Sequence, residues 1–149
     1  MNRTIPRAAV STPTNIGFLL AKASQRFNEL LVKRFAERGF ADVRASYGSV
    51  LVPLFERDGL RLGELAAVSR LSKQAMTGLV KLCEQDGLVV RGRDVDDGRA
   101  FRVSLSARGR RFQAVADDVL REFDEELVRS LGTHKRDALV EALKGVIDL

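Results

Sequence analysis

The sequence is poor in the residues from which catalytic and metal sites are most often built. Its 149 residues include one cysteine, one histidine and no tryptophan. A single cysteine excludes a disulfide within the chain, and one histidine without further cysteines leaves no zinc site of recognisable spacing. A glycine-rich phosphate loop is missing too, and His134 is interpreted as a solvated polar residue. We therefore expect no enzyme, no metal site and no cofactor.

Long hydrophobic runs are also missing. No apolar stretch approaches the ~20 residues of a membrane-spanning helix. The first fifteen residues lack an apolar core followed by a small-residue cleavage site. We therefore predict a cytoplasmic protein without a membrane partner, and interpret residues 1–14 as a flexible arm. With 45% hydrophobic residues in 149, the chain is expected to form a single domain.

Positive charge is in moderate excess, with a formal net charge of +5. Such an excess favours a polyanionic partner without establishing one. What matters more is where the cations stand in the pattern of predicted elements.

Residues 72–87 predict a helix with two chemically different sides. Ser72 is a suitable N-cap. Gly87 follows the last predicted helical residue, where helices often end in a left-handed backbone conformation that glycine adopts. At about 100° per residue, one side is apolar and consists of Met76, Leu79, Val80 and Cys83. The other side is polar, with two cations and no anion, and consists of Lys73, Gln74, Thr77, Gly78 and Lys81. In an isolated helix this pattern would more often indicate an ordinary solvated face, although the polar side also suits DNA contact.

The flanking segments favour the DNA interpretation. A short apolar helix is predicted at residues 63–69, and the link through Arg70 and Leu71 is short enough for a helix-turn-helix. Two β-patterned runs, Leu88–Arg93 and Ala100–Leu105, enclose an acidic turn and predict a basic hairpin, or wing. The recognition helix would enter the major groove and the wing tip the minor groove. The candidate DNA contacts are Ser72, Lys73, Gln74, Thr77, Gly78, Lys81, Arg91, Arg93 and Arg99.

Amphipathic helices are predicted on both sides of this centre, at residues 15–38 and 106–149, with the winged-helix region at 43–105. The terminal helices have too little partner surface within one chain, so we expect them to form a two-fold homodimer. A helix is also predicted over residues 43–57. Its Pro53 removes the hydrogen bond to the Ser49 carbonyl, so we expect a kink or an interruption there.

Five short motifs carry a resemblance to a known family. They are ELA at residues 64–66, SKQAM at 72–76, DGLV at 86–89, DVDDGR at 94–99 and LSARG at 105–109. This stretch resembles the DNA-binding core of MarR-type transcriptional regulators. Val95 stands where that family usually has proline. The resemblance implies a mainly α-helical fold with a small β-hairpin wing, in which a winged helix-turn-helix core is flanked by dimerisation helices. It also implies a homodimer that binds double-stranded DNA at a pseudo-palindromic operator.

The family motif also suggests roles for side chains outside the recognition helix. Asp97 is the aspartate expected to hold the Arg99 guanidinium, unless it merely shapes the turn. Some members sense oxidants through a cysteine near the first helix, but Cys83 falls on the inward face of the recognition helix and is interpreted as a core residue.

A ligand crevice between the dimer helices and the winged-helix region is a further implication of the resemblance. In the family it often binds phenolic or other aromatic anions, so a small-molecule effector is an expected partner. Its candidate lining residues are Phe18, Arg26, Arg44, Ser46, Tyr47 and Val50. Tyr47 could equally be an ordinary packing residue.

Two functions from different classes remain. The first is a homodimeric, sequence-specific DNA-binding regulator, taken as a repressor whose DNA affinity a small ligand modulates. The second is a winged-helix protein-interaction module without DNA binding, which would need apolar or acidic outer faces. The cations on the predicted helix and wing favour the first.

Overall fold

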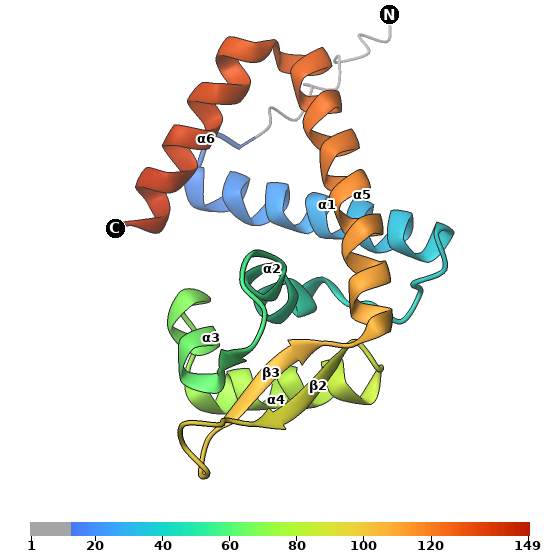
Figure 1. The fold of residues 1–149 in the computed structure, drawn as a ribbon. Helices are drawn as coiled ribbons and strands as arrows, with labels where there is room; N and C mark the ends of the chain where they lie inside the picture. The colour runs from blue at the N-terminus through green and yellow to red at the C-terminus, as the bar shows by residue number, and fades with distance from the viewer. Residues whose placement is uncertain (1–12) are drawn as a thin grey trace, which may run out of the picture.

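The computed structural model describes residues 13–149 and is mainly α-helical (Figure 1). The elements are α1 (Ile16–Glu37), η1 (Ala45–Tyr47), α2 (Gly48–Glu56), β1 (Leu60–Arg61), α3 (Leu62–Val68), α4 (Lys73–Gln85), β2 (Val89–Arg93), β3 (Phe101–Leu105), α5 (Ala107–Leu131) and α6 (Thr133–Ile147). The helix η1 is a 3-10 turn. The predicted fold class, a winged helix-turn-helix with long flanking helices, is confirmed. The predicted flexible arm lies almost wholly outside the described residues.

The helices and the sheet form two parts in Figure 1. α1, α5 and α6 surround an open space, and α2, α3, α4 and the sheet lie together on the other side. α5 runs from one part to the other, so it joins the long helices to the winged-helix region.

The sheet has one more strand than the sequence predicted. Its order is β1-β3-β2, and both pairs are antiparallel. β1 is two residues long and pairs Leu60 with Val103 and Arg61 with Arg102. A strand of two residues has no period-2 pattern, which is why the sequence does not reveal it. The two wing strands each begin one residue later than predicted.

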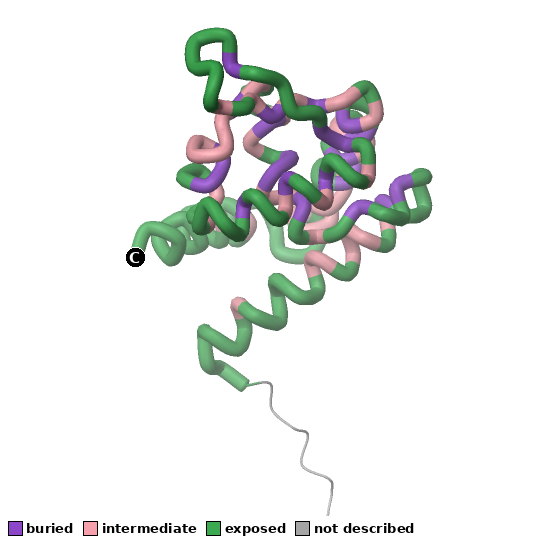
Figure 2. Tube along the Cα trace, turned by 90° about the horizontal axis from the view of Figure 1, so that it is seen from below, coloured by how far each residue is buried: buried purple, intermediate pink, exposed green. Residues whose placement is uncertain are grey.

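The hydrophobic core lies in the winged-helix region. Leu51, Leu54, Leu65, Met76 and Leu88 are each at most 1% exposed. Figure 2 shows the same distribution, with buried positions gathered in this region and α6 exposed along its length. The core therefore fixes α4 and the wing, and leaves the terminal helices with apolar residues still uncovered.

The beginning of α5 packs tightly against the end of α4. Ser106 caps α5 by accepting a hydrogen bond from the Gly109 amide, and its hydroxyl donates to the Gly87 carbonyl. A Cβ on Gly109 would lie 2.1 Å from the Leu88 carbonyl oxygen. Only glycine allows this approach, which explains the glycine at the end of the LSARG motif.

Pro53 lies inside α2 without ending it, since the helix is continuous from Gly48 to Glu56. Of the two alternatives expected at Pro53, a kink or an interruption, the interruption is wrong. The irregularity comes earlier, where η1 precedes α2. Pro53 has no amide hydrogen to donate to the Ser49 carbonyl. That carbonyl instead accepts a hydrogen bond of 2.5 Å from the Ser69 hydroxyl at the end of α3. The missing helical bond has thus become a bond between α2 and α3.

We predict that this replacement is measurable in a double-mutant cycle. Ser69→Ala should lower the free energy of unfolding by about 1 kcal/mol, because it leaves the Ser49 carbonyl without a donor. In a Pro53→Ala background the new alanine amide supplies that donor, so Ser69→Ala should cost clearly less. Urea unfolding of the four proteins measures the difference. Equal costs in both backgrounds would contradict the account.

Candidate nucleic-acid interface

The recognition helix α4 has the two sides that the sequence predicts. Ser72 caps it, its hydroxyl accepting from the Ala75 amide at 3.1 Å. Gly87 follows with φ +72°, a conformation that glycine adopts without strain. Met76, Val80 and Cys83 are buried, with at most 1% exposure.

The outward side of α4 is open to solvent. Its exposed residues are Ser72, Lys73, Gln74, Thr77, Gly78 and Lys81. The Thr77 hydroxyl donates to the Lys73 carbonyl at 2.7 Å, so it is already engaged within the helix. A Cβ on Gly78 would meet no described atom within 4 Å, so the fold itself does not require glycine there. A small residue at this place suits close approach by an external surface.

The turn before α4 is tight. Arg70 has φ +53°, which is uncommon for a residue other than glycine. The Leu71 amide then donates to the Ala66 carbonyl at 2.9 Å, which closes the turn. The Arg70 guanidinium reaches the far end of α6, where it donates to the Ile147 carbonyl at 2.7 Å. The turn of the helix-turn-helix is therefore joined to the last helix of the chain.

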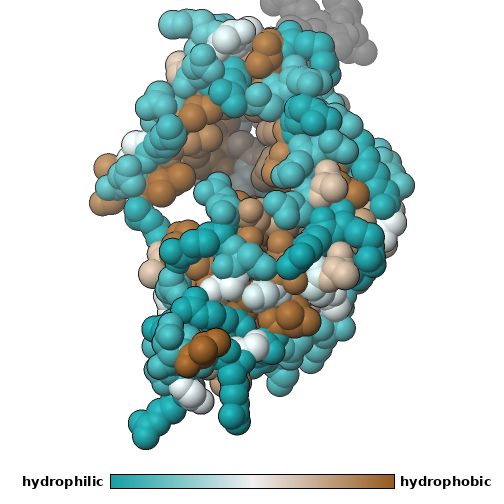
Figure 3. All heavy atoms as spheres, viewed as in Figure 1, coloured by the Kyte–Doolittle hydropathy of each residue, from teal (hydrophilic) through white to brown (hydrophobic). Residues whose placement is uncertain are grey.

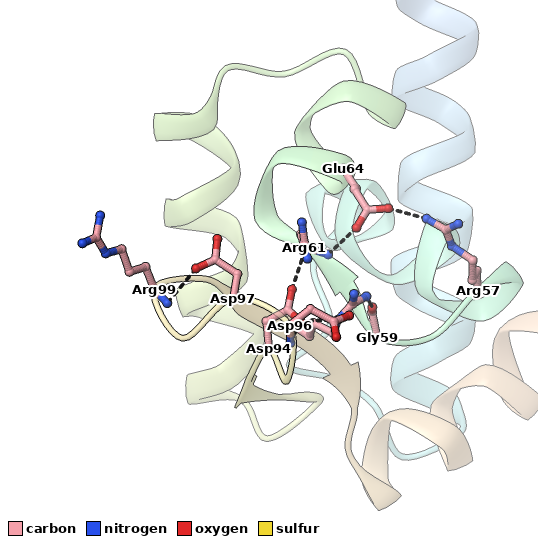
Figure 4. A network of polar contacts seen from close by, with 9 residues as sticks. Arg57, Gly59, Arg61, Glu64, Asp94, Asp96, Asp97 and Arg99 are labelled. Atoms are coloured by element: carbon pink, nitrogen blue, oxygen red, sulfur yellow. Dashed lines mark hydrogen bonds and ion pairs between the residues drawn. The ribbon is translucent and has the colours of Figure 1, made fainter.

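The wing presents its cations in different ways. Arg91 is paired with Glu84 of α4 at 3.0 Å, while Arg93 is exposed. Arg99 is exposed at the wing tip, and in Figure 4 its guanidinium points away from the neighbouring carboxylates. Val95 is 98% exposed. Among the expected wing contacts, Arg93 and Arg99 are thus the side chains open to an incoming partner.

The structure corrects the expected contact of Asp97. Its carboxylate accepts from the backbone amide of Arg99 at 3.0 Å, and not from the guanidinium (Figure 4). Aspartate readily bonds to the backbone two residues further on, and this local bond forms a turn. Asp97 therefore shapes the wing loop, which is the simpler of the two roles considered.

Sequence reasoning missed the carboxylate that fastens the wing, Asp94. Its side chain is 1% exposed and accepts from Arg61 Nε at 2.5 Å, while Arg102 Nε lies 3.4 Å away. The Asp96 amide donates to it at 3.0 Å. Three aspartates stand within four positions of the turn, so the sequence offers no signal as to which one is buried.

The charge of Asp94 is retained over a wide pH range. The hydrogen bond from the Asp96 amide, followed by the bond from Arg61 and the nearby Arg102, holds the pKa of this carboxyl below its usual value. The lowered pKa means that its contribution to stability is present above the unfolded-state pKa and is lost as the pH falls through the folded one. The wing is thus fastened at neutral pH.

The six residues expected to line a ligand crevice do not come together. Tyr47 and Val50 are 0% exposed, so they are core residues. The Tyr47 hydroxyl donates to Asp86 at 2.5 Å, and burial followed by this bond raises the pKa of Tyr47 to about 12. Phe18, Arg26 and Ser46 are exposed, and Arg26 forms an ion pair with Glu29 on its own helix. The packing interpretation of Tyr47 is the correct one.

A cavity nevertheless lies close to the expected crevice. It has a volume of about 150 Å³ and lies between α1, α2 and α5. Its walls are largely apolar, with Phe27, Leu31 and Phe112 among them, and Arg44 is the cation at its edge. Arg44 is the one member of the expected set that lines it.

Two other classes of site were sought within the part of the chain that the structure describes. No group of three or more histidine, cysteine or carboxylate side chains there could hold a metal ion. None of its helices has the length and apolar character needed to cross a membrane.

Comparison with known proteins finds a family match over part of the chain. The model of the MarR family matches residues 54–100. The HTH-type transcriptional repressor Rv2887 of Mycobacterium tuberculosis is 33% identical over 78 residues. That match covers 52% of this chain and 56% of the repressor, so the chain spans about half the length of this relative.

Solved structures extend the likeness to most of the chain. A probable transcriptional regulator from Pseudomonas aeruginosa is 26% identical with a TM-score of 0.77, covering 89% of this chain and 97% of that one. The transcriptional repressor CouR, bound to a 23-mer DNA duplex, is 26% identical with a TM-score of 0.76, covering 89% and 92%. The MepR–DNA complex of Staphylococcus aureus, at 17% identity and a TM-score of 0.78, shares the fold.

We predict that Cys83 is chemically inert in the folded protein. Burial raises the pKa of its thiol to about 12, so the reactive thiolate is scarce at pH 8. Labelling with an aromatic disulfide reagent at pH 8 should be slow in the native protein and fast in urea. Rapid native labelling, with the fold intact by circular dichroism, would contradict the core assignment.

Proposed function

Because the chain belongs to the MarR family, we propose that it is a homodimeric, sequence-specific regulator that binds double-stranded DNA and acts as a repressor. The observation that carries the proposal is the outward side of α4, which is exposed, cationic and open at Gly78. The named role of Rv2887 as a repressor and the DNA-bound state of CouR support it.

The proposed contacts divide by chemistry. Gln74 can pair with adenine and the Thr77 methyl can contact a thymine methyl, so these two residues would read bases in the major groove. Lys81 stands further along the same exposed side and Ser72 at its beginning. Arg99 would enter the minor groove, where a narrow A·T-rich segment attracts arginine. Arg93 would follow the backbone near it. Arg91 is held by Glu84 and would have to leave it to contribute.

Dimerisation is proposed because the single chain leaves apolar residues of α6 and α1 exposed. Every residue of α6 is exposed or half-buried, although its sequence is amphipathic. Its large exposed hydrophobic residues are Leu139, Leu143, Val146 and Ile147. In Figure 3 apolar residues line the side of α6 that faces the open space. A helix buries such a stripe against another element, and α1 exposes Ile16 and Leu19 in the same way.

An effector site is proposed at the cavity between α1, α2 and α5. Its apolar walls and Arg44 suit a small aromatic anion. A volume of about 150 Å³ is small for a drug-sized ligand, so the occupant would have to be compact or the helices would have to separate.

We predict that base reading can be separated from general affinity. A Gln74→Ala/Thr77→Ala variant should lose discrimination between operator and random duplex, with about 1–3 kcal/mol lost for each good base contact. The probe is the DNA flanking the gene, or a duplex selected from a random pool, measured by fluorescence anisotropy. Gln85→Ala, at the far end of α4, is a matched control.

The outcomes distinguish the proposed functions. Unchanged discrimination in the double variant would remove α4 from the contact surface. A parent protein that binds neither the flanking DNA nor any selected duplex would contradict DNA binding and favour a protein-interaction module.

We predict that the apolar side of α6 holds the dimer together. Sedimentation at micromolar concentration should show a dimer for the parent and a monomer for Leu139→Glu/Leu143→Glu, because two charges would enter the interface. Glu141→Ala/Lys144→Ala alters an exposed ion pair on the same helix and should remain dimeric. A folded parent that sediments as a monomer would contradict the model.

A further inference from the structure

A cleft separates the recognition helix from the wing. It has a volume of about 530 Å³, and its walls include Arg61, Gly63, Glu64, Lys73 and Arg99. Lys73 begins α4, Arg99 stands at the wing tip, and Arg61 lies between them at the end of β1. The cleft therefore connects the two elements that the proposed function places in neighbouring DNA grooves.

The geometry of a duplex requires something to cross this cleft. Neighbouring major and minor grooves of B-DNA are separated by one sugar-phosphate strand. If α4 lies in the major groove and the wing tip in the adjacent minor groove, that shared strand must pass between them. The cleft is the space between them on the protein.

We propose that the cleft seats the sugar-phosphate strand between the two grooves, and that Arg61 and Lys73 bind its phosphates. The proposal rests on DNA binding as the proposed function, and it adds Arg61, which the sequence analysis did not include. It also assigns Lys73, so far a DNA contact without a stated role, to a phosphate.

The guanidinium of Arg61 is held in a fixed orientation before DNA binds. Its Nε donates to the Asp94 carboxylate at 2.5 Å, so the two terminal nitrogens extend beyond this bond. The Asp94 side chain is 1% exposed and that of Arg61 is 40% exposed, so the anchor is buried and the fork reaches solvent. A guanidinium fixed in advance loses less side-chain entropy on binding and keeps its planar geometry for phosphate oxygens.

Asp94 itself has little freedom to follow Arg61. The Asp96 amide donates to it, and its own amide donates to the Ala100 carbonyl at 3.1 Å. Arg102 lies against it and also donates to the Gly59 carbonyl at 2.8 Å. Asp94 is thus a positioning residue, held by both sides of the wing base.

Lys73 lies toward the same cleft. Its Cε is 3.5 Å from the place that a Cβ on Gly63 would occupy, so its stem runs beside α3. The one carboxylate in the cleft wall is Glu64. It is already engaged, since it accepts from the Arg61 amide at 3.1 Å and from Arg57 at 2.5 Å. The cleft therefore keeps a net positive character.

The test is the salt dependence of DNA binding. Each phosphate contact contributes about 0.9 to the slope of log K against log[salt], so Arg61→Ala or Lys73→Ala in a dimer should lower the slope by about 1.8. Discrimination between operator and mismatched duplex should stay constant. Arg121→Ala is the matched control, because Arg121 is also paired with a carboxylate, that of Asp118 on α5, and neither residue lines the cleft.

A second measurement locates the contact on DNA. Neutral methylphosphonates replace single phosphates of the operator in turn. At one position per half-site, the methylphosphonate and Arg61→Ala should remove the same contact. The affinity lost on combining them should therefore be smaller than the sum of the two separate losses. Asp94→Asn tests the aiming: it removes an anion near DNA, so charge alone predicts tighter binding and aiming predicts weaker binding. Circular dichroism and thermal unfolding confirm the fold of each variant.

The outcomes separate the two proposals. If the parent binds no DNA, the proposed function fails. If the parent binds and both Arg61→Ala and Lys73→Ala match Arg121→Ala, only the cleft proposal fails. If Lys73→Ala loses discrimination at one base pair, Lys73 reads a base and does not bind a phosphate. If Arg61→Ala does not fold, Lys73→Ala and Asp94→Asn still decide.

Discussion

The buried carboxylate of Asp94 is the contact on which the wing depends. It joins the end of β2 to Arg61 in β1 (Figure 4). It also joins β2 to Arg102 in β3. A charge removed from water is costly unless it is paired and hydrogen-bonded, and Asp94 has both kinds of partner. Because β1 leads directly into α3, the same contact also orients the wing relative to the helix-turn-helix. Loss of one arginine would leave a buried charge half-satisfied, so the three residues act together.

The end of the recognition helix is fastened in a comparable way. The Asp86 carboxylate accepts from Tyr47 of η1, and its backbone carbonyl accepts from Arg108 of α5 at 2.7 Å. Arg108 also pairs with Asp42 at 2.8 Å and lies over the Phe40 ring. The cavity between α1, α2 and α5 is bordered by Arg44 and Ala45, close to Tyr47 in the chain. A ligand that moved η1 would therefore act on α4 through the Tyr47–Asp86 bond.

The sequence predicted best where periodicity and caps determine the outcome. The two sides of α4, the Ser72 cap and the Gly87 stop all follow from spacing, and the structure confirms them. It failed where a tertiary contact decides between similar residues. The buried member of three aspartates, the burial of Tyr47 and the rescue of the Ser49 carbonyl by Ser69 all depend on segments distant in sequence. The two-residue strand β1 was too short to show any pattern, and with it the partner of Asp94 was missed.

The contact between Arg70 and α6 links the two halves of the proposed function. A dimer that uses successive major grooves must hold its recognition helices about 34–36 Å apart. In the proposed dimer the terminal helices would set that spacing, and α4 would read the bases. Arg70 stands in the turn just before α4, and its guanidinium meets the Ile147 carbonyl and Asp148 at the end of α6. The side chains of Arg70 and Asp148 are both largely exposed, so this ion pair adds little to the stability of the fold. Its effect is geometric: a shift of α6 in the dimer interface would reach the helix-turn-helix at the turn that precedes α4.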